Sequence, residues 1–406
     1  MSGAVVVTGL GIVSPAGLGI RDYWAQTCGD GKYGGATRLG AAAGERPGPT
    51  LAAPPGGDLL WGRPQADRMA RLTLAAADWA LADAGIRPQD LPDLGPDAVT
   101  AVTAAAVAAT ASAGRPGRGS WPGFGARSRA AYESGAGGPR AAVGRQAGGY
   151  RSFAWFYAVS SGQISIRDGM RGLDAVAHAR RQIRQGSRLI VSGGVDAPLC
   201  PSGWPAQGSV PCNGTGTGNG NGNGNGAGSS PSPSIRPGGG ALLVLEDAVT
   251  ALAREAKIYG EVAGYGATFD PEPSGGRERG LRRAVELALT DAWALPGEVD
   301  AVFVPGLDAA ESAAVTAVFG VHGVPVTAPR TMTGRHYQAA AAPLDLTAAL
   351  LAMDEGLIPP TADVAPCPGY DLNVVLSPRA AELRTTVVLG RGHGGFNSAV
   401  VLRAVY

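Results

Sequence analysis

Strand-like and helix-like segments alternate along this chain, and that alternation restricts the fold more than any other feature of the sequence. Short runs rich in Val, Ile and Leu alternate with longer segments whose apolar residues recur at helical spacing. The predicted strands are 5–8, 98–107, 188–192, 238–245, 301–304, 325–327, 386–389 and 398–402, and the predicted helices are 67–84, 173–185, 281–292, 311–319 and 343–356. This order predicts an α/β protein with largely parallel inner sheets.

Two low-complexity segments interrupt the alternation. Residues 115–150 are rich in Gly, Arg and Pro, and residues 213–234 consist mostly of Gly, Asn and Ser. Neither can bury enough apolar surface to join a core, so both are predicted to be irregular or disordered loops. The remaining pattern predicts an N-terminal half over 1–250 and a C-terminal half over 251–406.

Charge and cysteine content exclude several classes of partner and place. The chain has 34 Lys and Arg against 33 Asp and Glu, so it offers no electrostatic reason to bind nucleic acid or an anionic membrane. Its N-terminus lacks the basic region of a signal peptide, and no apolar run is typical of a membrane span. The four cysteines form no CxxC pair, which favours a reducing, cytoplasmic setting.

Familiar catalytic and cofactor motifs are weak here. Gly9-x-Gly11 follows the first strand, where we expect a glycine-rich turn, but Ser14 and Pro15 break the dinucleotide fingerprint. Cys200 lies in a proline-bounded loop after a strand, which is not the setting of a reactive thiolate. No metal or cofactor site is predicted, because no two histidines have metal-ligand spacing among His178, His322, His336 and His393.

The helix predicted over 173–185 carries Arg180, Arg181 and Arg184 towards its C-terminal end. Cations there complement the negative end of the helix dipole, and this is our main interpretation of the three arginines. An amphipathic helix followed by a buried strand and a glycine pair is also the layout of the inner layer of acyl-transfer enzymes. In such a layer the nucleophile stands just before the helix, whereas here Arg171 and Gly172 precede Leu173.

Several long motifs resemble the chain-length factors of type II aromatic polyketide synthases, the β-subunit partners of a ketosynthase. The motifs include "VVVTGLGIVSPAGLG", "SFAWFYAVSSGQISIRDGMRG", "YGEVAGYGATFDP" and "LGRGHGGFNSAVVLRA". The resemblance covers most of the chain outside 115–150 and 205–237. It implies a thiolase-like fold with two pseudo-duplicated βαβαβαββ halves and a layered α-β-α-β-α core. It also implies a heterodimer with a ketosynthase α-subunit, on which an acyl carrier protein bearing a phosphopantetheine-bound polyketide docks.

Active members of that superfamily use a Cys nucleophile and two His residues, and the resemblance implies that this chain has none of the three. The nucleophile position is deleted, because the chain passes from "GMRG" directly to the helix at Leu173. The first His position falls in the Pro305-Gly306 region, and Arg335 occupies the second. The sequence therefore predicts no catalytic residue. The retained motif positions, to which the resemblance gives a structural role, are Asp308, Glu311, Gly334, Gly394, Gly395 and Asn397.

Two features bear on the missing strand and turn before Leu173. Gln146 lies in a "QAGG" sequence that chain-length factors carry at the nucleophile position, but here it stands far upstream. A chance match in a glycine-rich loop is the preferred interpretation, with a rearranged or frameshifted gene as the alternative. The segment 160–167 alternates well enough to replace the lost edge strand. The interface candidates are Gln163, Ile164, Ile166 and Arg171.

The leading hypothesis is a non-catalytic chain-length factor that pairs with a ketosynthase and shapes the polyketide tunnel. One alternative is a β-ketoacyl-acyl carrier protein synthase-type acyltransferase or malonyl decarboxylase with residual activity. Another is a degenerate homologue without a stable function. Because the edge strand is missing, a weakened heterodimer is expected more than an intact one.

Overall fold

The computed structural model describes residues 3–14, 17–29, 68–86, 99–103, 173–196, 239–270, 277–333, 340–362, 371–391 and 395–405. Our predictions for 115–150, 160–167 and 213–234 lie outside these residues. The same holds for Gln146, Gln163, Ile164, Ile166, Arg171, Gly334, Arg335 and Gly394. No helix in the described part of the chain is long and apolar enough to cross a membrane.

One large mixed sheet runs through the molecule, in the order β10-β8-β7-β12-β13-β6-β1-β5-β4-β3, with β2 paired to β1. The order is symmetric about the β1·β6 pair. On the N-terminal side β1 is followed by β5 and β4, and on the C-terminal side β6 is followed by β13 and β12, so each side runs from the first strand of its half to the last and then the penultimate strand. The strands are β1 (Val5–Ser14), β2 (Gly17–Leu18), β3 (Val99–Thr103), β4 (Leu189–Asp196), β5 (Gly239–Asp247), β6 (Gly260–Phe269), β7 (Ala301–Phe303), β8 (Pro325–Thr327), β10 (Asn373–Val374), β12 (Thr385–Arg391) and β13 (Phe396–Arg403); β9 (Leu357–Ile358) and β11 (Arg379–Ala380) form a separate pair.

The expectation of largely parallel sheets is wrong. Parallel pairing joins β3 to β4, β7 to β12 and to β8, and β8 to β10, whereas the central pairs are antiparallel. The cause is visible at β12 and β13, which are separated by only four residues, 392–395. So short a connection reverses the chain into the neighbouring strand, while a parallel crossover needs a dozen residues or more.

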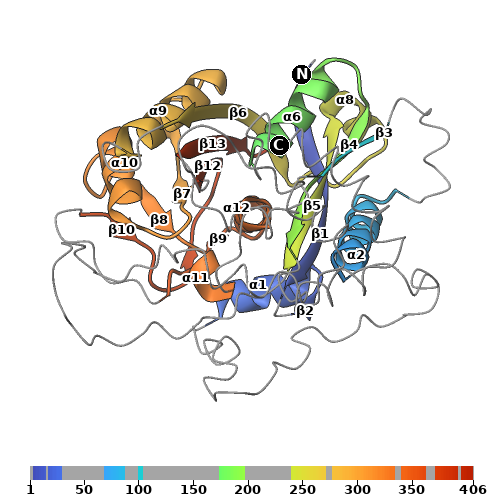
Figure 1. The fold of residues 1–406 in the computed structure, drawn as a ribbon, viewed down its shortest axis with the longest axis horizontal. Helices are drawn as coiled ribbons and strands as arrows, with labels where there is room; N and C mark the ends of the chain where they lie inside the picture. Colours follow the sequence, from blue (N-terminus) through green and yellow to red (C-terminus); the bar gives the residue numbers. More distant parts are fainter. Residues whose placement is uncertain are drawn as a thin grey trace, which may run out of the picture.

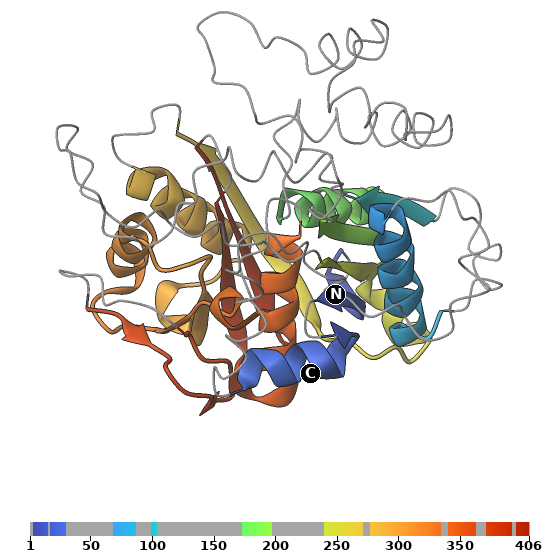
Figure 2. The same ribbon diagram turned by 60° about the horizontal axis from the view of Figure 1, so that its bottom comes forward.

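Helices form three layers around the strands, which confirms the predicted α-β-α-β-α arrangement. Helix α2 covers the outside of the N-terminal strands, α9 and α10 cover the outside of the C-terminal strands, and α6 and α12 lie between the two sides (Figures 1 and 2). The helices are α1 (Ile20–Cys28), α2 (Arg68–Asp83), α6 (Leu173–Arg184), α8 (Ala248–Ala253), α9 (Arg277–Asp291), α10 (Ala309–Phe319), α11 (Arg330–Thr333) and α12 (Ala341–Glu355), with a short 3-10 turn, η5 (Pro296–Glu298).

The predicted turn after residue 8 is also wrong, because β1 continues to Ser14. Gly9 and Gly11 let helix α2 lie directly on the strand: a Cβ on Gly9 would stand 2.1 Å from the Ala80 carbonyl oxygen, and one on Gly11 would stand 1.8 Å from that of Ala76. Such distances leave no room for any side chain. The two glycines therefore serve close helix–sheet packing and form no nucleotide-binding turn.

The second half repeats this contact. On β6, a Cβ on Gly264 would stand 2.2 Å from the Ala288 oxygen, and one on Gly266 would stand 2.1 Å from the Ala284 oxygen of α9. The pair α9–β6 is thus the counterpart of α2–β1, and the Gly-x-Gly motifs are the residue-level signature of the duplication. The predicted division at residue 250 falls inside α8, and we keep it as a proposal.

Candidate functional site

Helix α6 begins in the middle of the molecule, at the place where the resemblance puts a nucleophile. Leu173 is fully buried, and its Cδ1 atom would lie 2.8 Å from a Cβ on Gly390 of β12. The next residue, Asp174, accepts a hydrogen bond from the Tyr265 hydroxyl of β6. The first turn of α6, an element of the N-terminal half, is therefore fixed against two strands of the C-terminal half.

The other end of α6 is fixed in the same way, and here the dipole interpretation is wrong for one arginine. Arg180 is only 5% exposed. Its guanidinium forms an ion pair with Asp291, the last residue of α9, and donates to the Ala263 carbonyl oxygen of β6. Asp291 also accepts from the Tyr265 backbone nitrogen at 2.9 Å. Arg180 thus bridges the two halves, and burial lowers its pKa while Asp291 opposes that shift.

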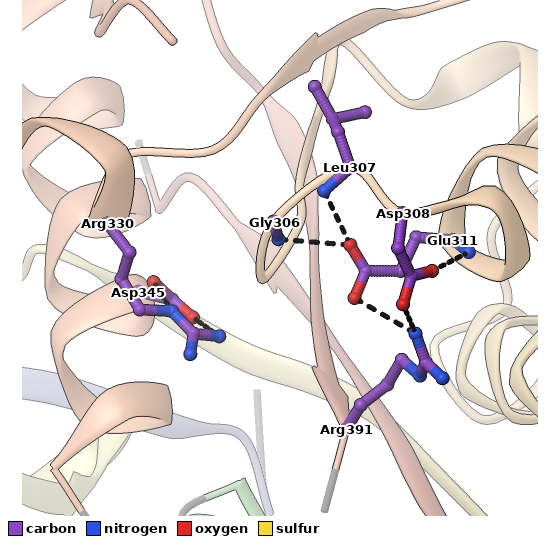
Figure 3. A network of polar contacts seen from close by, with 7 residues as sticks. All are labelled: Gly306, Leu307, Asp308, Glu311, Arg330, Asp345 and Arg391. Atoms are coloured by element: carbon purple, nitrogen blue, oxygen red, sulfur yellow. Dashed lines mark hydrogen bonds and ion pairs between the residues drawn. The ribbon is translucent and has the colours of Figure 1, made fainter. Parts of the chain in front are cut away.

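The loop after β7 is organised by one buried carboxylate. Glu311 Oε2 accepts hydrogen bonds from the backbone nitrogens of Gly306, at 3.0 Å, and Leu307, at 2.7 Å (Figure 3). Leu307 has a left-handed backbone, with φ 61°, which is uncommon for a residue with a branched side chain. The Pro305-Gly306 region, where the resemblance places the first His, is therefore a tight turn held by Glu311.

Asp308 and Arg391 complete this arrangement. Asp308 caps helix α10 by accepting from the Glu311 backbone nitrogen at 2.9 Å. Arg391, the last residue of β12, donates to the Asp308 carboxylate and lies 3.3 Å from Glu311 Oε1. Burial raises the pKa of the Glu311 carboxyl, as does the neighbouring Asp308, and Arg391 opposes both. One guanidinium therefore balances two carboxylates beside the start of α6.

A second buried ion pair lies next to the first cluster (Figure 3). Arg330 Nε donates to Asp345 Oδ1 at 2.9 Å, and its Nη2 atom lies 2.6 Å from Oδ2. Burial raises the pKa of the Asp345 carboxyl to about 7, although Arg330 lowers it, and Glu311 contributes a further increase. Since each pair affects the titration of the other, the two form one polar network in the interior.

The raised pKa of Asp345 predicts a specific pH dependence. Because the folded pKa of about 7 exceeds the ordinary Asp pKa of 3.8, the folded protein retains this proton to higher pH than the unfolded chain does. The stability that Asp345 contributes is full below pH 4 and is lost as the pH rises through 7. Asp345→Asn cannot titrate, so the wild type should lose on the order of 2 kcal/mol relative to this variant between pH 5 and pH 8.

Urea unfolding of both proteins at pH 5, 6, 7 and 8 measures this difference. Asp371→Asn, at an exposed carboxyl, is the matched control and should follow the wild type. Parallel stability curves for the wild type and Asp345→Asn would show that Asp345 is ionised throughout the range.

The C-terminal glycine motif forms a third contact between strand ends. Asn397 Nδ2 donates to Asp270 Oδ2 at 2.7 Å, and the Asp270 backbone nitrogen donates to the Gly395 carbonyl oxygen at 2.8 Å. Gly395 has φ 100°, and a Cβ there would stand 1.9 Å from the Asp270 oxygen. Gly395 and Asn397 thus join the end of β6 to the start of β13.

The structure brings Asp308 and Glu311 together and places Gly395 and Asn397 in a separate contact. Sequence reasoning missed Arg330, Asp345, Arg391 and Asp270. In the described part of the chain the network contains no thiol, and the one described cysteine, Cys28, is half-buried with its pKa raised to about 12 by burial. The acids of the network are each balanced by an arginine.

Comparisons with known proteins agree with this description. The family model described as the beta-ketoacyl synthase N-terminal domain matches residues 61–218, and the C-terminal domain model matches 259–365. The actinorhodin polyketide putative beta-ketoacyl synthase 2 of Streptomyces coelicolor is 43% identical, over 98% of both chains. The tetracenomycin polyketide synthase ketoacyl synthase beta subunit of Streptomyces glaucescens is 41% identical, again over 98% of both.

Solved structures share the fold at lower sequence identity. The ishigamide ketosynthase/chain length factor matches with a TM-score of 0.65 and 23% identity, over 99% of both chains. A type II acyl-carrier protein in complex with its ketosynthase bound to the hexaketide includes a chain that matches with a TM-score of 0.66 and 22% identity, also over 99% of both. These matches confirm the predicted thiolase-like, ketosynthase fold.

Proposed function

The chain belongs to the β-ketoacyl synthase family, among the chain-length factors of type II polyketide synthases, and from this premise we propose that it is a non-catalytic subunit. It pairs with a ketosynthase α-subunit in the cytoplasm and forms one wall of the tunnel in which a polyketide grows. An acyl carrier protein delivers the substrate to the pair. The relatives named for actinorhodin and tetracenomycin synthases support this role.

One observation carries the non-catalytic part of the proposal. Where the condensing reaction needs a thiolate and donors for the developing negative charge, this chain has the buried Leu173 and the closed network of Glu311, Asp308 and Arg391. Both carboxylates are engaged by Arg391 and by backbone nitrogens. We infer that this interior supports the fold of the pair, while the partner ketosynthase carries out the condensation.

Acyl transfer provides the direct test. We expect the purified complex, incubated with labelled malonyl-acyl carrier protein, to acquire label on the ketosynthase α-subunit and none on this chain, as read by intact mass spectrometry. The chain alone should neither accept the label nor release carbon dioxide from the malonyl group. A stoichiometric adduct on this chain, or decarboxylation by the chain alone, would instead support the acyltransferase alternative.

We further propose that residues 160–167 supply the edge strand beside β3. In the described part of the chain the N-terminal side of the sheet ends at β3, whereas the C-terminal side continues past β7 to β8. If 160–167 fills this edge, size-exclusion chromatography of the co-expressed pair should show a one-to-one complex, in place of the weakened heterodimer expected from the missing strand, and Ile164→Asp combined with Ile166→Asp should disrupt it. A complex that survives both substitutions would remove 160–167 from the interface.

A further inference from the structure

Trp293 is the most exposed large apolar residue among those described, with 92% of its surface accessible. It is the second residue after α9 and has φ 53°. The Ala294 nitrogen donates to the Leu289 oxygen and the Trp293 nitrogen to the Thr290 oxygen, so Trp293 occupies the left-handed position of a Schellman motif. That position strongly favours glycine, because a side chain is strained there.

The other half of the molecule provides an internal comparison. Helix α2, the counterpart of α9, ends with the same two hydrogen bonds, from Ile86 to Leu81 and from Gly85 to Ala82. Its left-handed residue is Gly85, with φ 69°. The same fold element is therefore closed by glycine in one half and by an exposed tryptophan in the other. Neither backbone conformation nor core packing accounts for the indole.

Two exposed arginines lie on the last turn of α6, close to the Arg180–Asp291 ion pair that joins the two halves: Arg184 donates to the Gly3 carbonyl oxygen at 3.1 Å, and Arg181 lies 3.5 Å from His178 Nδ1. Arg180 forms an ion pair with Asp291, the last residue of α9 and two residues before Trp293, so this side chain links α6 to the end of α9. Arg181 and Arg184 of that turn are exposed, and in the part of the chain that the structure describes neither has a carboxylate within ion-pair distance. The carboxylates near this link are already engaged, Asp291 by Arg180 and Glu261 by Arg403.

We propose that Trp293, Leu295, Arg181 and Arg184 form a docking surface, the seam patch, for an acidic segment of a partner protein. Leu295 is 68% exposed and extends the apolar part of the patch. Tryptophan and arginine dominate the energetics of protein interfaces, and exposed guanidinium groups without a described carboxylate partner, near the same Arg180–Asp291 link as an exposed indole, fit carboxylates that flank an apolar side chain. Nucleic acid fits less well, because its affinity rests on many phosphate contacts and this chain has a net charge of only +1. This inference goes beyond the proposed function and does not depend on it.

A defined peptide tests the proposal. The probe is a synthetic amphipathic helix with glutamates flanking leucines, and its counterpart with lysine at every glutamate position is the reference. We expect the full chain to bind the acidic peptide saturably and at least tenfold more tightly than the basic one, with affinity falling as salt is added. Fluorescence anisotropy of labelled peptides gives both affinities.

Two variants and two controls locate the binding site. Trp293→Gly should bind the acidic peptide at least tenfold more weakly and melt at an equal or higher temperature, because glycine suits the left-handed position. Arg181→Glu combined with Arg184→Glu should weaken binding at least as much. Leu376→Ala, at a residue 71% exposed elsewhere, and Arg279→Glu, on the exposed face of α9, should leave the affinity within twofold.

The proposal is wrong if the acidic peptide does not bind, or if Trp293→Gly binds it as the wild type does. It is also wrong if a single-stranded oligonucleotide binds more tightly than the acidic peptide through the same residues. Finally, pairing with the ketosynthase α-subunit should leave peptide affinity unchanged. Loss of binding in the pair would assign the patch to the subunit interface instead.

Discussion

Replacing Gly11 or Gly266 with alanine is expected to destabilise the protein by more than about 3 kcal/mol, a large part of the roughly 5–15 kcal/mol by which a folded protein is stable. A single added methyl group would stand 1.8 Å from the Ala76 oxygen in the first case and 2.1 Å from the Ala284 oxygen in the second. The obstacle is helix backbone, which cannot rotate away as a side chain can. The whole of α2 or α9 would have to move off its strand.

Expression yield in the soluble fraction and urea unfolding of any recovered protein provide the measurement. Gly297→Ala is the matched control, because a Cβ at Gly297 meets no atom within 4 Å, and it should unfold within about 0.5 kcal/mol of the wild type. If Gly11→Ala and Gly266→Ala were each as stable as the wild type, the two helices would have to pack farther from the sheet than described.

Arg391→Met is expected to cost about 3–5 kcal/mol, because it removes one partner of a buried ion pair and leaves Glu311 without a counter-charge. The loss should depend on pH in a definite direction. Without Arg391 the pKa of Glu311 rises further above its ordinary value, and stability from such a group is present at low pH and lost as the pH rises through the folded pKa. The variant should therefore lose more stability at pH 8 than at pH 5.

Glu311→Gln in the Arg391→Met background separates charge from packing. Glutamine keeps an acceptor for the Gly306 and Leu307 nitrogens and carries no charge, so the double variant should recover part of the lost stability and lose the extra pH dependence. Thermal unfolding of the wild type, both single variants and the double variant at the two pH values measures the coupling. Equal losses for Arg391→Met at pH 5 and pH 8 would contradict a charge-based origin.

Local pattern predicted most described helices and strands, because burial on one face imposes its period on the sequence. The α6 prediction of 173–185 against the observed Leu173–Arg184 is an example. Gly9 and Gly11 misled the prediction for a physical reason: glycine suits both a turn and a close approach of backbones. The same Gly-x-Gly spacing recurs at Gly264 and Gly266. Comparing the two motifs could have shown that the glycines serve helix–strand packing and not a turn.

The candidate site was predicted only where its residues are close in sequence. Asp308 and Glu311 are three residues apart and share a helix start, and the resemblance gave both a structural role. Arg391 is 83 residues from Asp308, and Arg180 is 111 residues from Asp291. No local pattern indicates which distant carboxylate will neutralise a buried arginine. Such ion pairs are set by the three-dimensional fold and not by proximity in the sequence.

The bridging of α6 also affects the order in which the protein can mature on the ribosome. The ion pair of Arg180 cannot form until Asp291 has been synthesised. The contact of Leu173 with β12 cannot form until Gly390 has been synthesised, about 200 residues after α6. At ~5–20 residues per second, that interval lasts on the order of 10–40 s. During this time α6 holds an apolar face and an uncompensated arginine without its final contacts. We therefore expect the N-terminal half to be prone to aggregation until the C-terminal strands emerge, and separate expression of the two halves should give poorly soluble products.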